Sequence, residues 1–164
     1  MRVLLVRGVG DVGSAVAYRL FVAGFGVVLH DTPQPTTTRR GMAFADAVFD
    51  GHARLAGIDA VLVNDLAAVS GIIALRAVIP VVVADLDAVP RAVLPDVAVD
   101  ARMRKRAAPE ATRGQARLSI GLGPAFIAGT PDIEPAEEPQ PEQPGQHQQR
   151  PTRQNREEYD ASAG

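Results

Sequence analysis

Residues 3–13 read Val-Leu-Leu-Val-Arg-Gly-Val-Gly-Asp-Val-Gly, a short apolar run that leads into a glycine-rich turn. The glycines at positions 8, 10 and 13 have the spacing G-x-G-x-x-G. The apolar run predicts a strand over Arg2–Val6, and apolar residues at helical spacing predict a helix that continues over Ser14–Val22. A strand, a glycine turn and a helix in this order are the start of a βαβ unit.

A second apolar run, Val27–His30, follows the helix, and Asp31 comes directly after it. In dinucleotide-binding βαβ units, an acidic residue at this place binds the ribose hydroxyls, and its charge repels a 2′-phosphate. We therefore expect NAD rather than NADP, or another phosphate-containing nucleotide.

Each glycine of the turn has a separate expected role. Gly8 permits the tight turn off the strand, Gly10 lets a pyrophosphate approach the backbone, and Gly13 lets the helix pack close to the strand. The helix start favours an anion through its N–H groups and dipole. Arg7 and Asp11 place charges beside this turn, and Asp11 either caps the helix or competes with a bound phosphate. The alternative is that the glycines only form a turn and bind no nucleotide.

Composition sets the limits of the fold. The chain has 164 residues, 46% of them hydrophobic and 4% aromatic, which is enough for one domain with an aliphatic core. A net charge of −2 gives no argument for nucleic acid or a membrane surface, and there is no apolar stretch long enough to span a bilayer. The absence of cysteine excludes disulfides, thiolate metal sites and a cysteine nucleophile, and is compatible with a cytoplasmic location.

The chain divides into a body over residues 1–129 and a tail over residues 130–164. The tail is rich in Pro, Glu, Gln and Arg and cannot bury enough apolar surface to order itself, so we expect it to be disordered, with a short helix near Asn155–Tyr159. In the body, strands alternate with helices, which predicts an α/β fold with a Rossmann-like, doubly wound, mostly parallel sheet and a small β-hairpin insertion. The further elements that we expect are a helical turn at Phe44–Phe49, hairpin strands His52–Leu55 and Ala60–Val63 around Ala56–Asp59, a helix at Asp65–Ser70 and nearby residues, and strands Pro80–Ala84, Pro95–Asp100 and Leu118–Leu122.

Ligands of open α/β sheets lie beyond the carboxyl ends of the strands. Besides the turn of Gly8, Val9, Gly10, Asp11 and Gly13 and the following Asp31, we expect three features there: Asp100, the basic run that includes Arg102 and Lys105, and a second glycine loop with Gly121 and Gly123. The basic run is otherwise a solvated helix face, and the second loop a plain turn. Arg39 and Arg40 either flank the adenosine end of a nucleotide or belong to a surface loop.

His30 and Asp31 are neighbours on a strand and so point to opposite faces. They are therefore not expected to act on one atom as an acid–base pair. The sequence contains no H-E-x-x-H motif, no clustered metal ligands and no Gly-x-Ser-x-Gly elbow. No catalytic constellation or metal site is predicted.

Several motifs in order resemble the selenium-dependent molybdenum hydroxylase accessory proteins, the YqeB-type family. They are Val-Arg-Gly-x-Gly-Asp at 6–11, Val-Ala-Tyr-Arg-Leu at 16–20, Ala-Gly-Phe at 23–25, Arg39-Arg40, Phe44 with Ala47, Gly51, Ile79-Pro80-Val81, Pro95-Asp96-Val97, Val99-Asp100-Ala101, Met103 with Lys105, Gly121–Phe126 and Ala128-Gly129. The resemblance covers about residues 3–129 and implies a role in the maturation of molybdenum hydroxylases of the xanthine dehydrogenase kind. Val9 and Ala125 stand where the family typically has glycine.

Three functions follow as hypotheses. The first is an accessory nucleotide-binding protein in molybdenum hydroxylase maturation, with such an enzyme or its maturation factors as partner. The second is a small NAD-dependent oxidoreductase, for which the sequence offers no convincing proton donor. The third is an interaction protein that has kept the fold without a ligand. Small Rossmann-like domains often dimerise, so a homodimer is compatible with each of the three.

Overall fold

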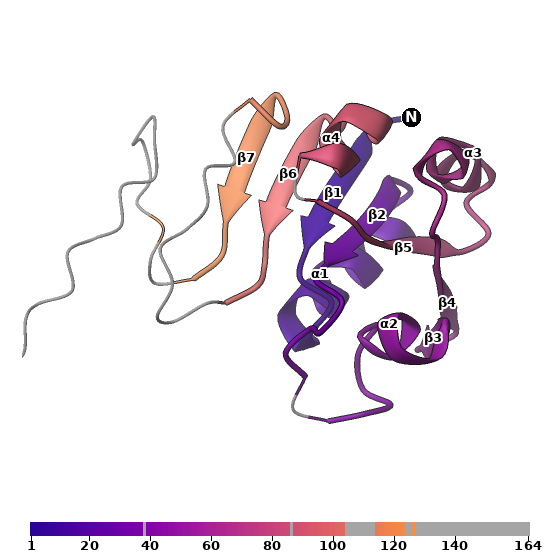
Figure 1. The fold of residues 1–164 in the computed structure, drawn as a ribbon. Helices are drawn as coiled ribbons and strands as arrows, with labels where there is room; N and C mark the ends of the chain where they lie inside the picture. Colours follow the sequence, from indigo (N-terminus) through magenta and orange to yellow (C-terminus); the bar gives the residue numbers. More distant parts are fainter. Residues whose placement is uncertain (38, 86, 104–113, 124–125, 127–164) are drawn as a thin grey trace, which may run out of the picture.

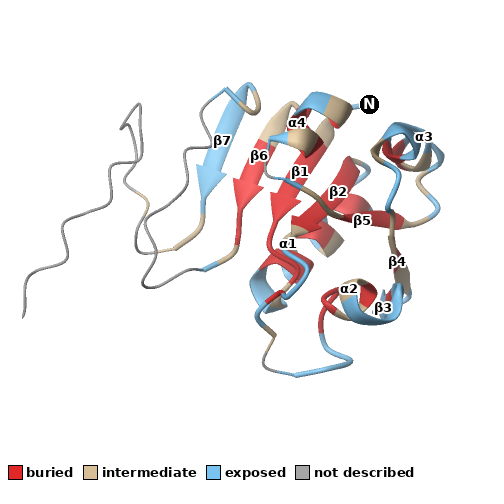
Figure 2. Ribbon diagram, in the orientation of Figure 1, coloured by how far each residue is buried: buried red, intermediate tan, exposed pale blue. Residues whose placement is uncertain are grey.

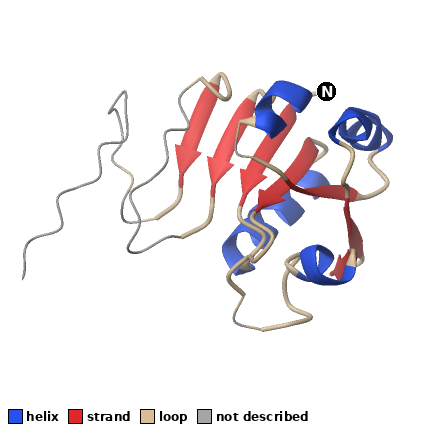
Figure 3. Cartoon of the chain, viewed as in Figure 1, coloured by secondary structure: helices blue, strands red, loops and turns tan. Residues whose placement is uncertain are grey.

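A computed structural model describes residues 1–37, 39–85, 87–103, 114–123 and 126. Its strands form one sheet, with helices packed around it (Figure 3). The order of the strands is β3-β4-β5-β2-β1-β6-β7, and neighbours are parallel except for β3 and β4. The bounds of the strands are β1 Val3–Arg7, β2 Gly26–Asp31, β3 His52–Leu55, β4 Ile58–Leu62, β5 Ile79–Val83, β6 Val97–Asp100 and β7 Leu118–Gly121.

Helices cover both faces of the sheet (Figure 1). Their bounds are α1 Asp11–Val22, α2 Asp46–Asp50, α3 Leu66–Leu75 and α4 Ala88–Val93. Successive strand residues point to opposite faces, so Val6 belongs to the core beneath α1 and α2, whereas Leu5 belongs to the core beneath α3 and α4. The central strands are consequently buried along their length (Figure 2). The predicted doubly wound α/β class is confirmed.

The run β5-β2-β1-β6-β7 has the strand order 3-2-1-4-5 of a Rossmann-like sheet. From β1 the chain moves to β2 and β5 on one side, and it then returns to the other side of β1 to form β6. The carboxyl ends of β1 and β6 are therefore the topological switch point, where sheets of this kind open a crevice.

The predicted hairpin is present at the edge of the sheet, but its turn is shorter than we expected. The turn consists of Ala56 and Gly57, both at positive φ (47° and 85°), as a type I′ turn requires. Ile58 and Asp59, which we assigned to the turn, instead begin β4, and β4 runs parallel to β5.

One helix prediction needs correction, and one helix was not predicted. Helix α1 begins at Asp11 rather than at Ser14, because the turn ends at Gly10, which is the N-cap. Helix α4 was not predicted, since Pro90 interrupts its apolar pattern, yet it lies in the first turn where proline is tolerated. No helix in the described parts of the chain is long and apolar enough to cross a bilayer. The predicted tail over residues 130–164, with its short helix, lies outside the described residues.

Candidate functional site

An open cleft with a volume of about 610 Å³ lies at the carboxyl ends of β1, β2 and β6. This volume is within the range of small-molecule sites, about 300–1,000 Å³. The turn after β1 lines it with Gly8, Gly10 and Asp11, and the loop after β6 lines it with Arg102 and Met103. Asp31, at the end of β2, forms a further wall together with threonines of the loop that follows. The cleft thus occupies the switch point of the sheet.

Two of the three glycines in the turn are required by the fold itself. A Cβ on Gly13 would lie 1.8 Å from the carbonyl oxygen of Gly8, so only glycine lets α1 pack this close to the end of β1. Gly8 has a φ of 109°, and a Cβ there would lie 3.0 Å from the backbone of Ala101. These two residues therefore hold together the turn and the loop after β6.

Gly10 has no such reason among the described residues. Its φ is −70°, which any residue adopts. A Cβ on it would meet only the carbonyl oxygen of Thr36, at the ordinary contact distance of 3.4 Å. Because Gly10 lines the cleft, its missing side chain leaves the backbone of the turn open to the cleft.

Asp31 is connected to the turn by its carboxylate. Its Oδ2 accepts a hydrogen bond from the Val9 N–H at 2.9 Å, and its Oδ1 accepts one from the Thr32 N–H at 2.8 Å. A carboxylate has about four lone-pair sites, so these bonds leave it able to accept hydroxyl donors from the cleft. Asp31 is half-buried and lies where a ribose-binding acid is expected.

Val9 shapes the turn without lining the cleft. Its side chain is fully buried in the core, and its carbonyl accepts a 2.8 Å hydrogen bond from the Ser14 hydroxyl. The same hydroxyl accepts a hydrogen bond from the Phe44 N–H at 2.8 Å. The valine side chain therefore does not obstruct the cleft.

Asp11 does not cap the helix, so this interpretation was wrong. The N-cap is Gly10, and the helix start has no side-chain capping bond. A capping side chain belongs to the N-cap residue, where it accepts a hydrogen bond from an N–H group of the first turn. Asp11 is the first helical residue, one position after the N-cap. Its exposed side chain instead lines the cleft, where its charge is available to oppose an anion.

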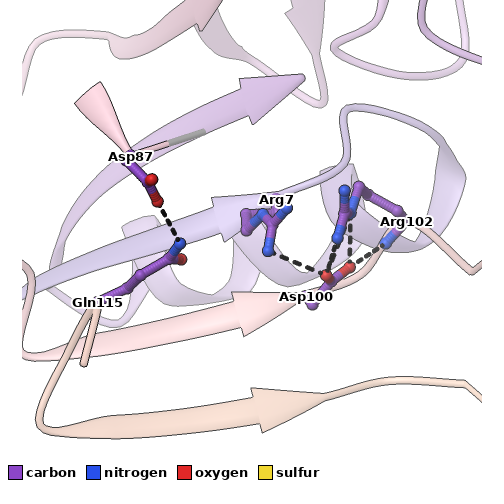
Figure 4. A network of polar contacts seen from close by, with 5 residues as sticks. All are labelled: Arg7, Asp87, Asp100, Arg102 and Gln115. Atoms are coloured by element: carbon purple, nitrogen blue, oxygen red, sulfur yellow. Dashed lines mark hydrogen bonds and ion pairs between the residues drawn. The ribbon is translucent and has the colours of Figure 1, made fainter. Parts of the chain in front are cut away.

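A buried ion-pair cluster lies beside the turn (Figure 4). Nη1 of the fully buried Arg7 is 3.4 Å from Oδ2 of Asp100, whose side chain is 3% exposed. Nε of Arg102 donates to both carboxylate oxygens of Asp100, at 3.0 and 3.1 Å. Sequence reasoning placed Asp100 at this edge but missed its pairing with Arg7. The signal was the presence of opposite charges at the ends of two strands that become neighbours.

His30 is buried and its Nε2 donates to the carbonyl oxygen of Ala84 at 2.9 Å. Burial is the largest cause that lowers its pKa below the ordinary value, and the positive charges of Arg7 and Arg102 lower it further, against the opposing effect of this hydrogen bond and of Asp31. His30 is therefore neutral at pH 7. The His30 side chain bonds to Ala84, whereas the Asp31 carboxylate bonds to the turn at Val9. The two side chains therefore do not act together, as expected of neighbours that point to opposite faces of a strand.

Of the second glycine loop, the described residues Gly121 and Gly123 do not line the cleft. Gly121 ends β7, and a Cβ on it would lie 2.1 Å from the ring of Phe126, so the glycine accommodates that ring. Gly123 has a φ of 139° and lies nearest to Met103. Lys105 and Ala125 lie outside the described residues.

The other polar residues singled out from the sequence lie on the surface. Arg40 pairs with Asp46 and Asp50 and so holds α2 to the loop before it, in line with the surface-loop interpretation. His52 lies 3.0 Å from Asp59 across the hairpin. No group of three or more metal-ligating side chains occurs within the described ranges.

Comparison with known proteins gives one informative similarity. The chain is 37% identical over 129 residues to the uncharacterized protein YqeB of Escherichia coli (strain K12). The match covers 78% of this chain but 23% of the relative, so the chain spans about a quarter of the relative's length. No family model matches the chain, and no solved structure matches it.

Proposed function

We propose that this chain is a cytoplasmic accessory protein that binds a phosphate-containing nucleotide, with NAD as the first choice, in the maturation of molybdenum hydroxylases. Gly10 carries the nucleotide part of the proposal. The fold gives no steric or torsional reason for glycine there, and the residue opens onto a cleft of suitable size. A phosphate in contact with the backbone would supply that reason.

The surrounding groups support the same ligand. The first turn of α1 opens into the cleft, and first-turn N–H groups lack acceptors within a helix. Asp31 is held at the end of β2 by the turn, ready to accept ribose hydroxyls. The molybdenum role has a different basis, the resemblance to the YqeB-type family.

The first test is Gly10→Asp with NAD titrated by calorimetry. A Cβ at this position meets only the Thr36 carbonyl oxygen, at 3.4 Å, so we expect the variant to fold. The added negative charge should repel a phosphate at the turn, so we expect NAD binding to be lost. Gly71→Asp is the matched control, since Gly71 is on α3 and a Cβ there meets nothing within 4 Å. A folded Gly10→Asp protein with unchanged NAD affinity would contradict the proposal.

The molybdenum role needs a separate measurement. A xanthine dehydrogenase-type hydroxylase is produced with the wild-type chain, with Gly10→Asp or with neither. We expect a larger active, metal-loaded fraction only with the wild type. Equal fractions in all three preparations would remove the maturation role and leave nucleotide binding to be judged by calorimetry.

A further inference from the structure

Among the arginines that the structure describes, Arg102 lines the cleft, and its side chain is only 9% exposed. Its Nε and Nη2 both donate to Asp100, which is itself buried at the end of β6. The guanidinium is thereby fixed before any ligand arrives. Preorganised donors of this kind lose little side-chain entropy on binding.

The fold places Arg102 at a defined position relative to the glycine turn. Arg7 and Asp100 are register partners in β1 and β6, and a Cβ on Gly8 would lie 3.0 Å from the backbone N of Arg102. Because β2 and β6 pair with opposite edges of β1, Asp31 and Arg102 lie on opposite sides of the turn. A ligand that spans the cleft would therefore contact Asp31, the glycine turn and Arg102 in that order. These offer an acceptor for hydroxyl groups, backbone N–H groups for a phosphate, and a positive charge.

The positive charge of Arg102 also acts beyond its own loop. The charges of both Arg7 and Arg102 reach the end of β2, where they contribute to the lowered pKa of His30. The charge of Arg102 therefore acts across the turn as far as the end of β2. Arginine binds phosphate oxygens through charge-assisted hydrogen bonds, about twice as strong as neutral ones.

We propose that Arg102 binds a second phosphate of the nucleotide, beyond the one at the glycine turn, so that the cleft selects nucleoside diphosphates and dinucleotides over monophosphates. Asp100 is the positioning residue for this contact. The inference rests on the proposed nucleotide binding and names the class of ligand for the same cleft.

The test compares ADP with AMP as probes, without divalent cations, in calorimetric titrations of the full chain. We expect the wild type to bind ADP at least about tenfold more tightly than AMP. Arg102→Gln should remove most of this preference while AMP affinity stays within about twofold, because AMP ends at the phosphate held by the turn.

Arg91→Gln, on the exposed side of α4, is the matched control for the loss of one positive charge and should keep the preference. If Arg102→Gln fails to fold, Arg102→Lys takes its place. Lysine keeps the charge but lacks the planar, two-donor guanidinium, so this variant should prefer ADP over AMP less strongly than the wild type does. Equal affinity of the wild type for ADP and AMP, or an equal loss of both in an Arg102 variant, overturns the inference and leaves nucleotide binding standing. A wild-type chain that binds none of the three ligands NAD, ADP and AMP overturns the proposed function and this inference with it.

Discussion

Gly10 and Gly13 lie in the same turn, but glycine is present at the two positions for different reasons. Gly13 is fixed by an internal contact, since its missing Cβ is what allows the carbonyl of Gly8 to lie against α1. Gly10 meets no such contact and faces the cleft. At the scale of single residues, this contrast separates a glycine that serves the fold from one that leaves room for a ligand.

His30 makes stability depend on pH. Its pKa is lower in the folded chain than in the unfolded one, so the unfolded state binds more protons once the pH falls below about 6.5. The contribution is fully present above that pH and declines as the pH falls toward the folded-state pKa. We expect the free energy of unfolding, measured with urea, to decrease from pH 7.5 to pH 5.5.

His30→Gln is the comparison variant for this effect. Its amide can still donate to the carbonyl of Ala84 but does not titrate, so part of the decrease should disappear. His52 and His147 remain in both proteins and cancel in the comparison. The same slope with pH in both proteins would show that His30 is not the group responsible.

At the scale of elements, helix α3 shows how local signals place a segment. Asp65 is its N-cap, and the Asp65 side chain accepts a hydrogen bond from the Ala67 N–H at 2.9 Å. The helix ends at Leu75, followed by Arg76 in the left-handed region with a φ of 50°. Arg76 then donates to the carbonyl of Phe21 at 2.6 Å, which connects the ends of α3 and α1.

Removal of the cap should destabilise α3 and, because Val69 and Ile73 are core residues, the whole domain. Loss of such a side chain costs about 1 kcal/mol. We therefore expect Asp65→Ala to lower the free energy of unfolding by about this amount. Asn64→Ala, at the preceding exposed position, is the control and should have a much smaller effect; equal losses would argue against the cap.

The sequence predicted the elements whose pattern is local. Apolar runs located β1, β2 and β5, and the glycine spacing located the turn between β1 and α1. The sequence did not predict α4, because Pro90 interrupts the apolar spacing that is typical of a helix. It also did not predict where β4 begins, because that depends on the positive φ of Ala56.

The site was predictable to the same extent. The glycine turn and Asp31 follow from spacing along the chain, and both line the cleft. The pairing of Arg7 with Asp100 requires knowledge that β1 and β6 are neighbours, although more than 90 residues separate them. The second glycine loop, by contrast, follows the edge strand β7, and its described residues Gly121 and Gly123 do not line the cleft.

At the scale of the whole molecule, the described sheet, both cores and the cleft are built from residues up to Leu122. The predicted boundary after residue 129 therefore has a direct test. A chain that ends at Gly129 should unfold in one cooperative transition with the free energy of unfolding of the full chain. It should also bind NAD with the same affinity.

Calorimetry and urea unfolding of the two chains side by side give both quantities. A shorter chain that is less stable would assign a structural role to residues 130–164. A shorter chain that is equally stable but binds NAD differently would assign them a role at the cleft. Either result would move the domain boundary beyond residue 129.

The central position of β1 also has a consequence for the time course of synthesis. Val3 contacts Asp96 through two hydrogen bonds, its N–H donating to the Asp96 carboxylate and its carbonyl accepting from the Asp96 N–H. Strand β1 thus leaves the ribosome nearly a hundred residues before β6, its second neighbour. Contacts so distant in sequence slow folding, and an unpaired apolar strand is prone to aggregate meanwhile. The cleft, which Ala101 and Arg102 line, accordingly forms only after β6 has been synthesised.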